Sequence, residues 1–188
     1  MPRLGKDDWV TAGLAALREH GPDAVAVQPL AARLGATKGS FYWHFATRDG
    51  LLDAVLARWL EESTERVIAD QERQHGDAAP AARFERLFEA VAAASEATPG
   101  EQRILAAAGH PAVGRAVRAA VERRIGYVTG LLMQAGLDDG PARRRALLAY
   151  MMYLGHAQLI AVAPGELAAG QARQAREDAV RMLLGDTR

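Results

Sequence analysis

Apolar residues recur at intervals of three and four along most of this 188-residue chain. Such spacing places them on one face of an α-helix, whereas a half-buried strand requires strict alternation. The stripes are clearest in residues 9–17, 51–60, 113–132 and 147–159. Glycine and proline pairs such as Gly21-Pro22 separate the stripes, as is usual where helices end. The sequence therefore predicts an all-α fold of about nine helices.

Charge and cysteine content exclude several classes of protein. The 23 basic and 23 acidic residues cancel, so any positive charge that attracts nucleic acid must be local. There is no cysteine, which excludes thiolate zinc sites, iron–sulfur clusters, disulfides and cysteine nucleophiles. Residues 1–8 lack the apolar run of a signal peptide, and polar residues interrupt the apolar stretch 146–163. We expect a soluble, intracellular protein with a buried helix at 146–163.

Residues 25–50 have the pattern of two short helices joined by a tight turn. Pro29 falls in the first turn of the first helix, where its missing N–H is tolerated, and Gly35 suits a left-handed helix end. Thr37 is placed to cap the next helix, and Thr47 to cap the long helix that follows. Two short helices with a glycine-containing turn form a helix-turn-helix, whose second helix can enter the major groove of DNA.

The second of these helices carries an unusual set of side chains for a purely structural element. Gly39 weakens a helix by about 1 kcal/mol relative to alanine, but it lets the backbone approach another surface closely. Hydroxyl and ring N–H groups on its neighbours are donors that suit phosphate oxygens. Phe41 and Phe45 are expected to pack into the core instead.

Residues 5 to about 60 resemble the DNA-binding domain of the TetR family of bacterial one-component transcription regulators. The resemblance rests on 9–17 as first helix, Leu-Ala-Ala-Arg-Leu-Gly at 30–35, Gly-Ser-Phe-Tyr-Trp-His-Phe at 39–45, and Arg48, Leu51 and Leu52 after them. It implies a DNA-binding helix-turn-helix domain at 1–47, with the motif at about 28–47, and a ligand-binding and dimerisation domain at 48–188.

The resemblance also implies which residues contact DNA. The candidates are Gln28, Arg33, Thr37, Lys38, Gly39, Ser40, Tyr42, Trp43, His44 and Arg48. Val27 departs from the pattern, because the family often has a capping serine or threonine there, and valine can neither cap the helix nor bind a phosphate. Residues 1–48 carry six basic and four acidic side chains, which predicts a moderate salt-driven affinity per subunit.

The carboxyl-terminal helices are expected to form an effector pocket and a dimer interface. The pocket candidates are Phe84, Phe88, Tyr127, Met151, Tyr153 and His156, although a core or interface position is the favoured alternative for His156. Helices at about 141–162 and 165–184 are the expected dimer face, with Leu148, Met152, Leu159, Ala172, Ala179, Val180 and Leu183 as candidates. No metal or other cofactor is expected, since no two of the five histidines are spaced as helical ligands.

The sequence favours a regulator over an enzyme, because nucleotide-binding, nucleophile-elbow and zinc-protease motifs are absent from it. We expect a homodimeric, cytoplasmic, nucleoid-associated bacterial regulator, a repressor that binds a palindromic operator and is released by a small-molecule effector. The alternative is a helical ligand-binding or interaction module without operator binding.

Overall fold

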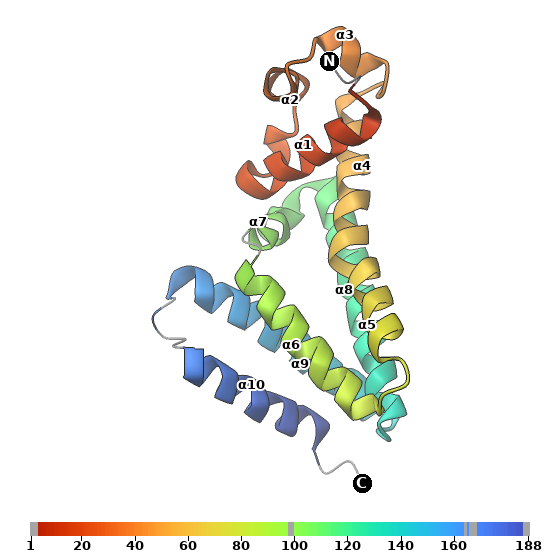
Figure 1. Cartoon of the computed structure of the whole chain (residues 1–188), viewed down its shortest axis with the longest axis vertical. Coiled ribbons are helices and arrows are strands. Elements are labelled where there is room, and N and C mark those ends of the chain that lie inside the picture. The colour runs from red at the N-terminus through yellow and green to blue at the C-terminus, as the bar shows by residue number, and fades with distance from the viewer. Residues whose placement is uncertain (1–3, 98–99, 164, 166–168, 186–188) are drawn as a thin grey trace. The chain divides into compact units, whose positions relative to one another are not determined.

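The computed structural model describes residues 4–97, 100–163, 165 and 169–185 (Figure 1). Within these ranges the chain forms helices and no strand, which confirms the predicted all-α class. The α-helices are α1 (Lys6–His20), α2 (Val27–Leu34), α3 (Lys38–Tyr42), α4 (Arg48–Leu60), α5 (Arg66–His75), α6 (Pro80–Ala97), α7 (Glu101–Ala106), α8 (Pro111–Gln134), α9 (Asp139–Val162) and α10 (Ala169–Leu184).

A π-helical turn, Glu61–Glu65, joins α4 to α5 without a break in the helix. Counted as one helix, this run from 48 to 75 gives nine helices among the described residues, as the periodicity predicts. The chain divides into two compact units, residues 1–66 with 100–120 and residues 67–99 with 121–188. We refer to them as the amino-terminal and carboxyl-terminal units. The functional boundary expected at residue 47 stays a prediction.

The core of the amino-terminal unit forms where α1 crosses α4. Trp9, Leu17 and Trp59 are fully buried there. The crossing is close because position 13 carries no side chain, and a Cβ added to Gly13 would lie 2.6 Å from Val55 Cγ2. The helix-turn-helix rests on this core through Leu30 and Phe41.

The turn between α2 and α3 follows from Gly35. Its φ of 62° and ψ of 30° are left-handed, a conformation that glycine adopts without steric penalty. The Ala36 N–H then donates to the Ala31 carbonyl at 2.8 Å, closing the end of α2. The amino end of α2 lacks such support, because Ala26 is its N-cap and no side chain caps it.

Threonine caps begin the next two helices, as predicted. The Thr37 hydroxyl accepts from the Ser40 N–H at 3.2 Å, and the Thr47 hydroxyl accepts from the Gly50 N–H at 3.0 Å. Each bond satisfies a backbone donor that a helix leaves unpaired at its first turn. These caps fix where α3 starts and where α4 leaves it.

The core of the carboxyl-terminal unit brings together α6, α9 and α10, which Figure 1 shows as neighbouring helices in green and blue. Alanines at 142, 146 and 149 line the buried face of α9 and allow its close approach to larger side chains such as Phe84 and Leu183. Arg145 on α9 donates to the Leu183 and Leu184 carbonyls at 3.0 and 2.7 Å, which caps the end of α10. The last helix was expected from about residue 165, but α10 begins at Ala169, and residues 166–168 lie outside the described residues.

None of the helices in the described part of the chain combines the length and apolar character needed to cross a membrane. The helix expected at 146–163 lies in α9, but the expectation that it is buried is wrong. One face is buried at Ala146, Ala149 and Ala157, whereas large apolar side chains such as Met151 and Val162 are exposed.

Candidate nucleic-acid interface

One face of α3 is anchored in the core of the amino-terminal unit. Phe41 is fully buried. The centre of its ring lies 5.3 Å from the centre of the Trp9 ring in an edge-on arrangement, and 5.6 Å from the centre of the stacked Phe45 ring. Phe45 is also buried, so both phenylalanines are core residues as predicted. This anchoring determines which side chains of α3 remain outside.

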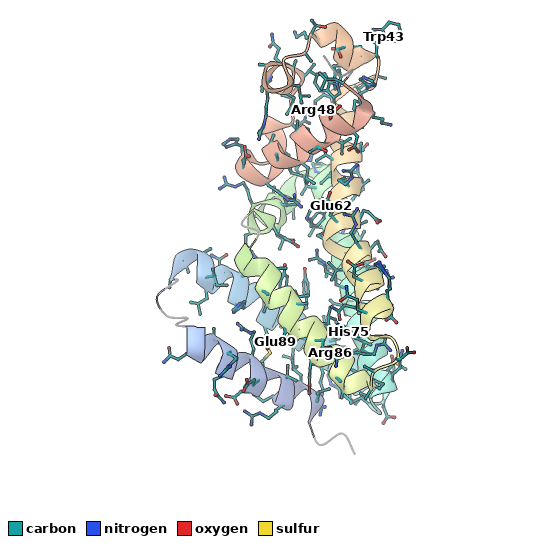
Figure 2. All side chains as sticks on the ribbon, in the orientation of Figure 1. Trp43, Arg48, Glu62, His75, Arg86 and Glu89 are labelled. Carbon is teal, nitrogen blue, oxygen red and sulfur yellow. The ribbon has the colours of Figure 1, made fainter. Side chains whose placement is uncertain are left out.

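The other face of α3 is open. Lys38, Gly39 and Thr37 are exposed, and Ser40 is half-buried. Tyr42 is 60% exposed and Trp43 is 87% exposed, although large aromatic side chains are normally buried. Figure 2 shows Trp43 at the edge of the amino-terminal unit, pointing away from its helices. An exposed aromatic pair beside a lysine is suited to contact with a nucleic acid.

Arg33 on α2 is already paired within the chain. Its two terminal nitrogens donate to the two Glu19 carboxylate oxygens at 3.1 and 3.3 Å. This hydrogen-bonded contact raises the pKa of Arg33 and lowers the pKa of Glu19. Part of the positive charge expected near the interface is therefore offset by α1, while Gln28 at the other end of α2 is exposed.

Arg48 holds the segment that precedes α2. Its Nε donates to the Val25 carbonyl at 2.9 Å, and a terminal nitrogen donates to the Pro22 carbonyl. Another terminal nitrogen lies 3.3 Å from the Asp49 carboxylate. The residue was expected to contact DNA, but these three bonds give it a structural role that the sequence alone did not indicate.

His44, just beyond α3, is half-buried and contacts the amino-terminal segment. Its Nε2 lies 3.1 Å from the Leu4 carbonyl oxygen. Nearby, the Lys6 ammonium lies 5.2 Å from the centre of the Phe45 ring. The His44 contact ties Leu4, which precedes α1, to the segment just after α3.

The predicted pocket residues fall into different environments in the carboxyl-terminal unit. Phe84 is buried with its ring 6.0 Å from the half-buried Phe88, and both belong to the core. Tyr153 and His156 are half-buried on α9, with the Tyr153 ring 5.8 Å from that of Tyr150. Met151 is 60% exposed, which places it on the outside of this unit instead of in an interior pocket.

Tyr127 lies near a polar cluster that no sequence motif predicts. Arg83 is 8% exposed, and it donates to the Gln134 side-chain oxygen at 3.0 Å and to the Glu72 carboxylate. Burial raises the pKa of the Tyr127 hydroxyl, and the neighbouring Glu72 carboxylate raises it further. These contacts tie α5, α6 and α8 together inside the carboxyl-terminal unit.

The predicted dimer residues divide between the core and the surface. Ala172, Ala179, Val180 and Leu183 are buried within the chain, where Val180 and Leu183 pack in the core with α6 and α9. Because these side chains are covered by the chain itself, their assignment to a dimer face is corrected. Met152 is half-buried, whereas Leu148 and Leu159 are 51% and 37% exposed.

Other exposed apolar side chains extend this outer surface. Met151 and Val162 lie on α9 with Leu148 and Leu159, and Met182 on α10 is 73% exposed. The residues Leu148, Met151, Leu159 and Val162 form what we call the α9 apolar stripe. Their spacing of three, eight and three residues keeps them near one face of the helix. Within the described ranges, no three histidine, aspartate or glutamate side chains are grouped to hold a metal ion.

Comparison with known proteins identifies the amino-terminal part of the chain. Residues 10–55 match the model of the bacterial regulatory proteins of the tetR family. The class G tetracycline repressor protein of Vibrio anguillarum is 35% identical over 71 residues, which are 38% of this chain and 34% of that protein. The match therefore covers about a third of the relative's length.

Solved structures match over nearly the whole chain. A TetR transcription regulator from Haloarcula marismortui has a TM-score of 0.75 at 21% identity, covering 94% of this chain and 96% of its own. BioQ, solved with its double-stranded DNA operator, has a TM-score of 0.56 at 22% identity, covering 96% of this chain and 98% of its own. Residues 10–55 are thus similar to the tetR family of bacterial regulatory proteins, and the described residues share the fold of solved structures that include a TetR transcription regulator.

Proposed function

We propose that the chain is a ligand-responsive, DNA-binding transcription regulator, a repressor that acts as a homodimer on a palindromic operator. The observation that carries the proposal is the open face of α3, where Lys38, Tyr42 and the largely exposed Trp43 stand beside a buried Phe41. The similarity to tetracycline repressors and to an operator-bound protein supports the same function. Such a regulator works in the bacterial cytoplasm on nucleoid DNA.

On this proposal α3 enters the major groove and its neighbours contact the backbone. Tyr42 and Lys38 supply a hydroxyl and an ammonium group to phosphates, and Gly39 allows the helix to approach closely. Gln28 and Thr37 are exposed at the starts of α2 and α3, where they suit contacts to bases or phosphates. Three further residues enter the interface while keeping their bonds within the chain. Arg33 stays paired with Glu19, His44 with the Leu4 carbonyl, and Arg48 with the carbonyls before α2.

A dimer supplies the second half-site that specificity requires. One short helix contacts too few base pairs to select a single site, whereas two-fold pairing reads two half-sites about one helical turn apart. We place the dimer contact on the α9 apolar stripe, and Met182 of α10 is a further exposed apolar side chain of the same unit. A small-molecule effector held in the carboxyl-terminal unit near Phe88, Tyr127 and Tyr153 then favours a dimer that binds DNA poorly, with a coupling of about 1–3 kcal/mol.

DNA binding is tested by fluorescence anisotropy with the DNA fragment that precedes the chain's own gene, at low salt. We expect Lys38→Ala and Tyr42→Ala each to weaken binding while helicity and oligomeric state stay unchanged. Arg143→Ala is the matched control, because it removes one exposed positive charge from α9. A wild-type protein that does not bind this fragment or other DNA selected from a random pool supports the alternative, an interaction module without operator binding.

The dimer surface is tested separately by sedimentation velocity. Met151→Glu places a charge in the α9 apolar stripe and is expected to shift the protein to monomers. Met133→Glu changes a similarly exposed methionine on α8 and is expected to leave the dimer intact. A wild-type protein that sediments as a monomer at micromolar concentration contradicts the proposed dimer.

A further inference from the structure

The contact between His44 and the amino-terminal segment fixes which ring nitrogen carries hydrogen. The partner of Nε2 is the Leu4 carbonyl oxygen, 3.1 Å away. A carbonyl oxygen only accepts hydrogen bonds, so Nε2 must be the donor. In a neutral imidazole one nitrogen donates and the other accepts. The neutral His44 ring therefore has a bare Nδ1 that can only accept.

A phosphate oxygen of DNA is also an acceptor, so it cannot form a hydrogen bond with that bare nitrogen. Protonation at Nδ1 changes this, because the ring then donates to Leu4 through Nε2 and to a phosphate through Nδ1. It also brings a positive charge to the interface, and hydrogen bonds between charged groups are roughly twice as strong as neutral ones. Histidine is the side chain whose charge ordinarily changes between about pH 5 and 8.

We propose that His44 contacts an operator phosphate only in its doubly protonated form, so that each subunit takes up one proton at Nδ1 when it binds DNA near or above neutral pH. The inference rests on the proposed DNA-binding function and adds a regulation to it. Operator affinity then falls as pH rises, without any change in the fold.

The carboxylates at the starts of α1 and α4 have partners other than His44. The titratable residues on α3 and in the first turns of α1 and α4 are Lys38 and Tyr42, Lys6, Asp7 and Asp8, and Arg48 and Asp49. Asp7 pairs with Arg58, Asp8 accepts from the Gly5 N–H at 2.7 Å, and Asp49 lies 3.3 Å from Arg48. Because these carboxylates are engaged elsewhere, the inference assigns the Nδ1 contact to an operator phosphate.

The test measures affinity for the fluorescent DNA fragment described above between pH 6.0 and 8.5 at constant ionic strength. For the wild-type dimer we expect the dissociation constant to rise about tenfold or more between pH 6 and pH 8. His44→Gln keeps a donor for the Leu4 carbonyl but cannot titrate, so its dissociation constant should be nearly independent of pH. His20→Gln is the matched control, since it removes an exposed histidine of the same unit and should keep the wild-type profile.

Histidine ¹⁵N NMR of the free protein at pH 8 supplies a second readout that involves no DNA. We expect the His44 signals of a ring protonated at Nε2 alone. A hydrogen on Nδ1 in the neutral ring overturns the inference, and so does a pH profile that is flat in the wild type or unchanged in His44→Gln. In these cases DNA binding itself stands, whereas a wild-type protein that binds no DNA at any pH overturns the proposed function together with this inference.

Discussion

Gly13 is the position where one added methyl group tests the packing of the amino-terminal unit most sharply. In Gly13→Ala the new Cβ would lie 2.6 Å from Val55 Cγ2, with Val25 Cγ1 at 3.7 Å and Leu30 Cδ1 at 3.9 Å. Val55 cannot move away easily, because it is fully buried and its branched side chain has few rotamers in a helix. The helices α1 and α4 must therefore separate or Val55 must leave its rotamer.

Two opposing terms set the size of this effect. Overpacking a filled core costs about 1–3 kcal/mol, and we take the upper half of that range because side chains from three elements meet at Gly13. Replacing glycine by alanine inside a helix stabilises the folded state by about 1 kcal/mol. The net loss in unfolding free energy is about 1–2 kcal/mol, which lowers Tm by roughly 3–6 °C in a chain of this size.

The assay is urea unfolding followed by tryptophan fluorescence, because all three tryptophans, at positions 9, 43 and 59, lie in the amino-terminal unit. Gly126→Ala is the matched control, since nothing lies within 4 Å of its added Cβ. Without a steric cost, this change should raise the free energy of unfolding by up to about 1 kcal/mol, measured by urea unfolding followed by circular dichroism. In a Val55→Ala background the Gly13→Ala cost should disappear. A Gly13→Ala variant as stable as wild type, or a cost that persists without the Val55 methyls, refutes the close crossing of α1 and α4.

Three further changes test other parts of the structure. Thr47→Ala should destabilise the protein by about 1 kcal/mol in urea unfolding because the α4 cap is lost, whereas Thr47→Ser should retain most of the stability; equal loss in both contradicts the capping role. Arg145→Ala should speed hydrogen exchange of the last amides of α10, since the Leu183 and Leu184 carbonyls lose their donor, and Arg144→Ala, an exposed neighbour, should leave exchange unchanged. In an ultraviolet titration, one of the four tyrosines should ionise above its ordinary value near pH 10, and Tyr127→Phe should remove that step. Because the pKa of Tyr127 is raised in the folded state, the stability that this hydroxyl contributes is present below its unfolded-state pKa and is lost as pH rises through its folded-state pKa. In that pH range the free energy of unfolding should fall more steeply in the wild type than in Tyr127→Phe.

Local features of the fold could be predicted from the sequence because their causes are close in the chain. The Thr37 and Thr47 caps, the left-handed Gly35 and the inward Phe41 each depend on residues within about one helical turn. The same applies to the open face of α3, which follows once Phe41 is placed in the core. The start of α2 differs from the expectation by one residue, because Ala26 and not Val27 is the N-cap, and no side chain caps the helix there.

Features that depend on tertiary partners could not be predicted. The sequence suggests DNA contacts for Arg48 and His44, but it does not reveal that they also bond to carbonyls 23 and 40 residues away, which only the folded chain brings near. Val180 and Leu183 show a similar limit, because an apolar stripe indicates that a face is buried without telling whether the same chain or a second copy covers it. The π-helical turn at 61–65 also has no clear sequence signal.

The central claim, that the open face of α3 binds DNA, is tested most directly by ¹⁹F NMR of protein labelled with 5-fluorotryptophan. The label gives one resonance for each of the three tryptophans, and Trp43→Phe assigns that of Trp43. On addition of the DNA fragment we predict a large shift for the 87% exposed Trp43, with little change for the fully buried Trp9 and Trp59. DNA binding that leaves the Trp43 resonance unmoved contradicts the account.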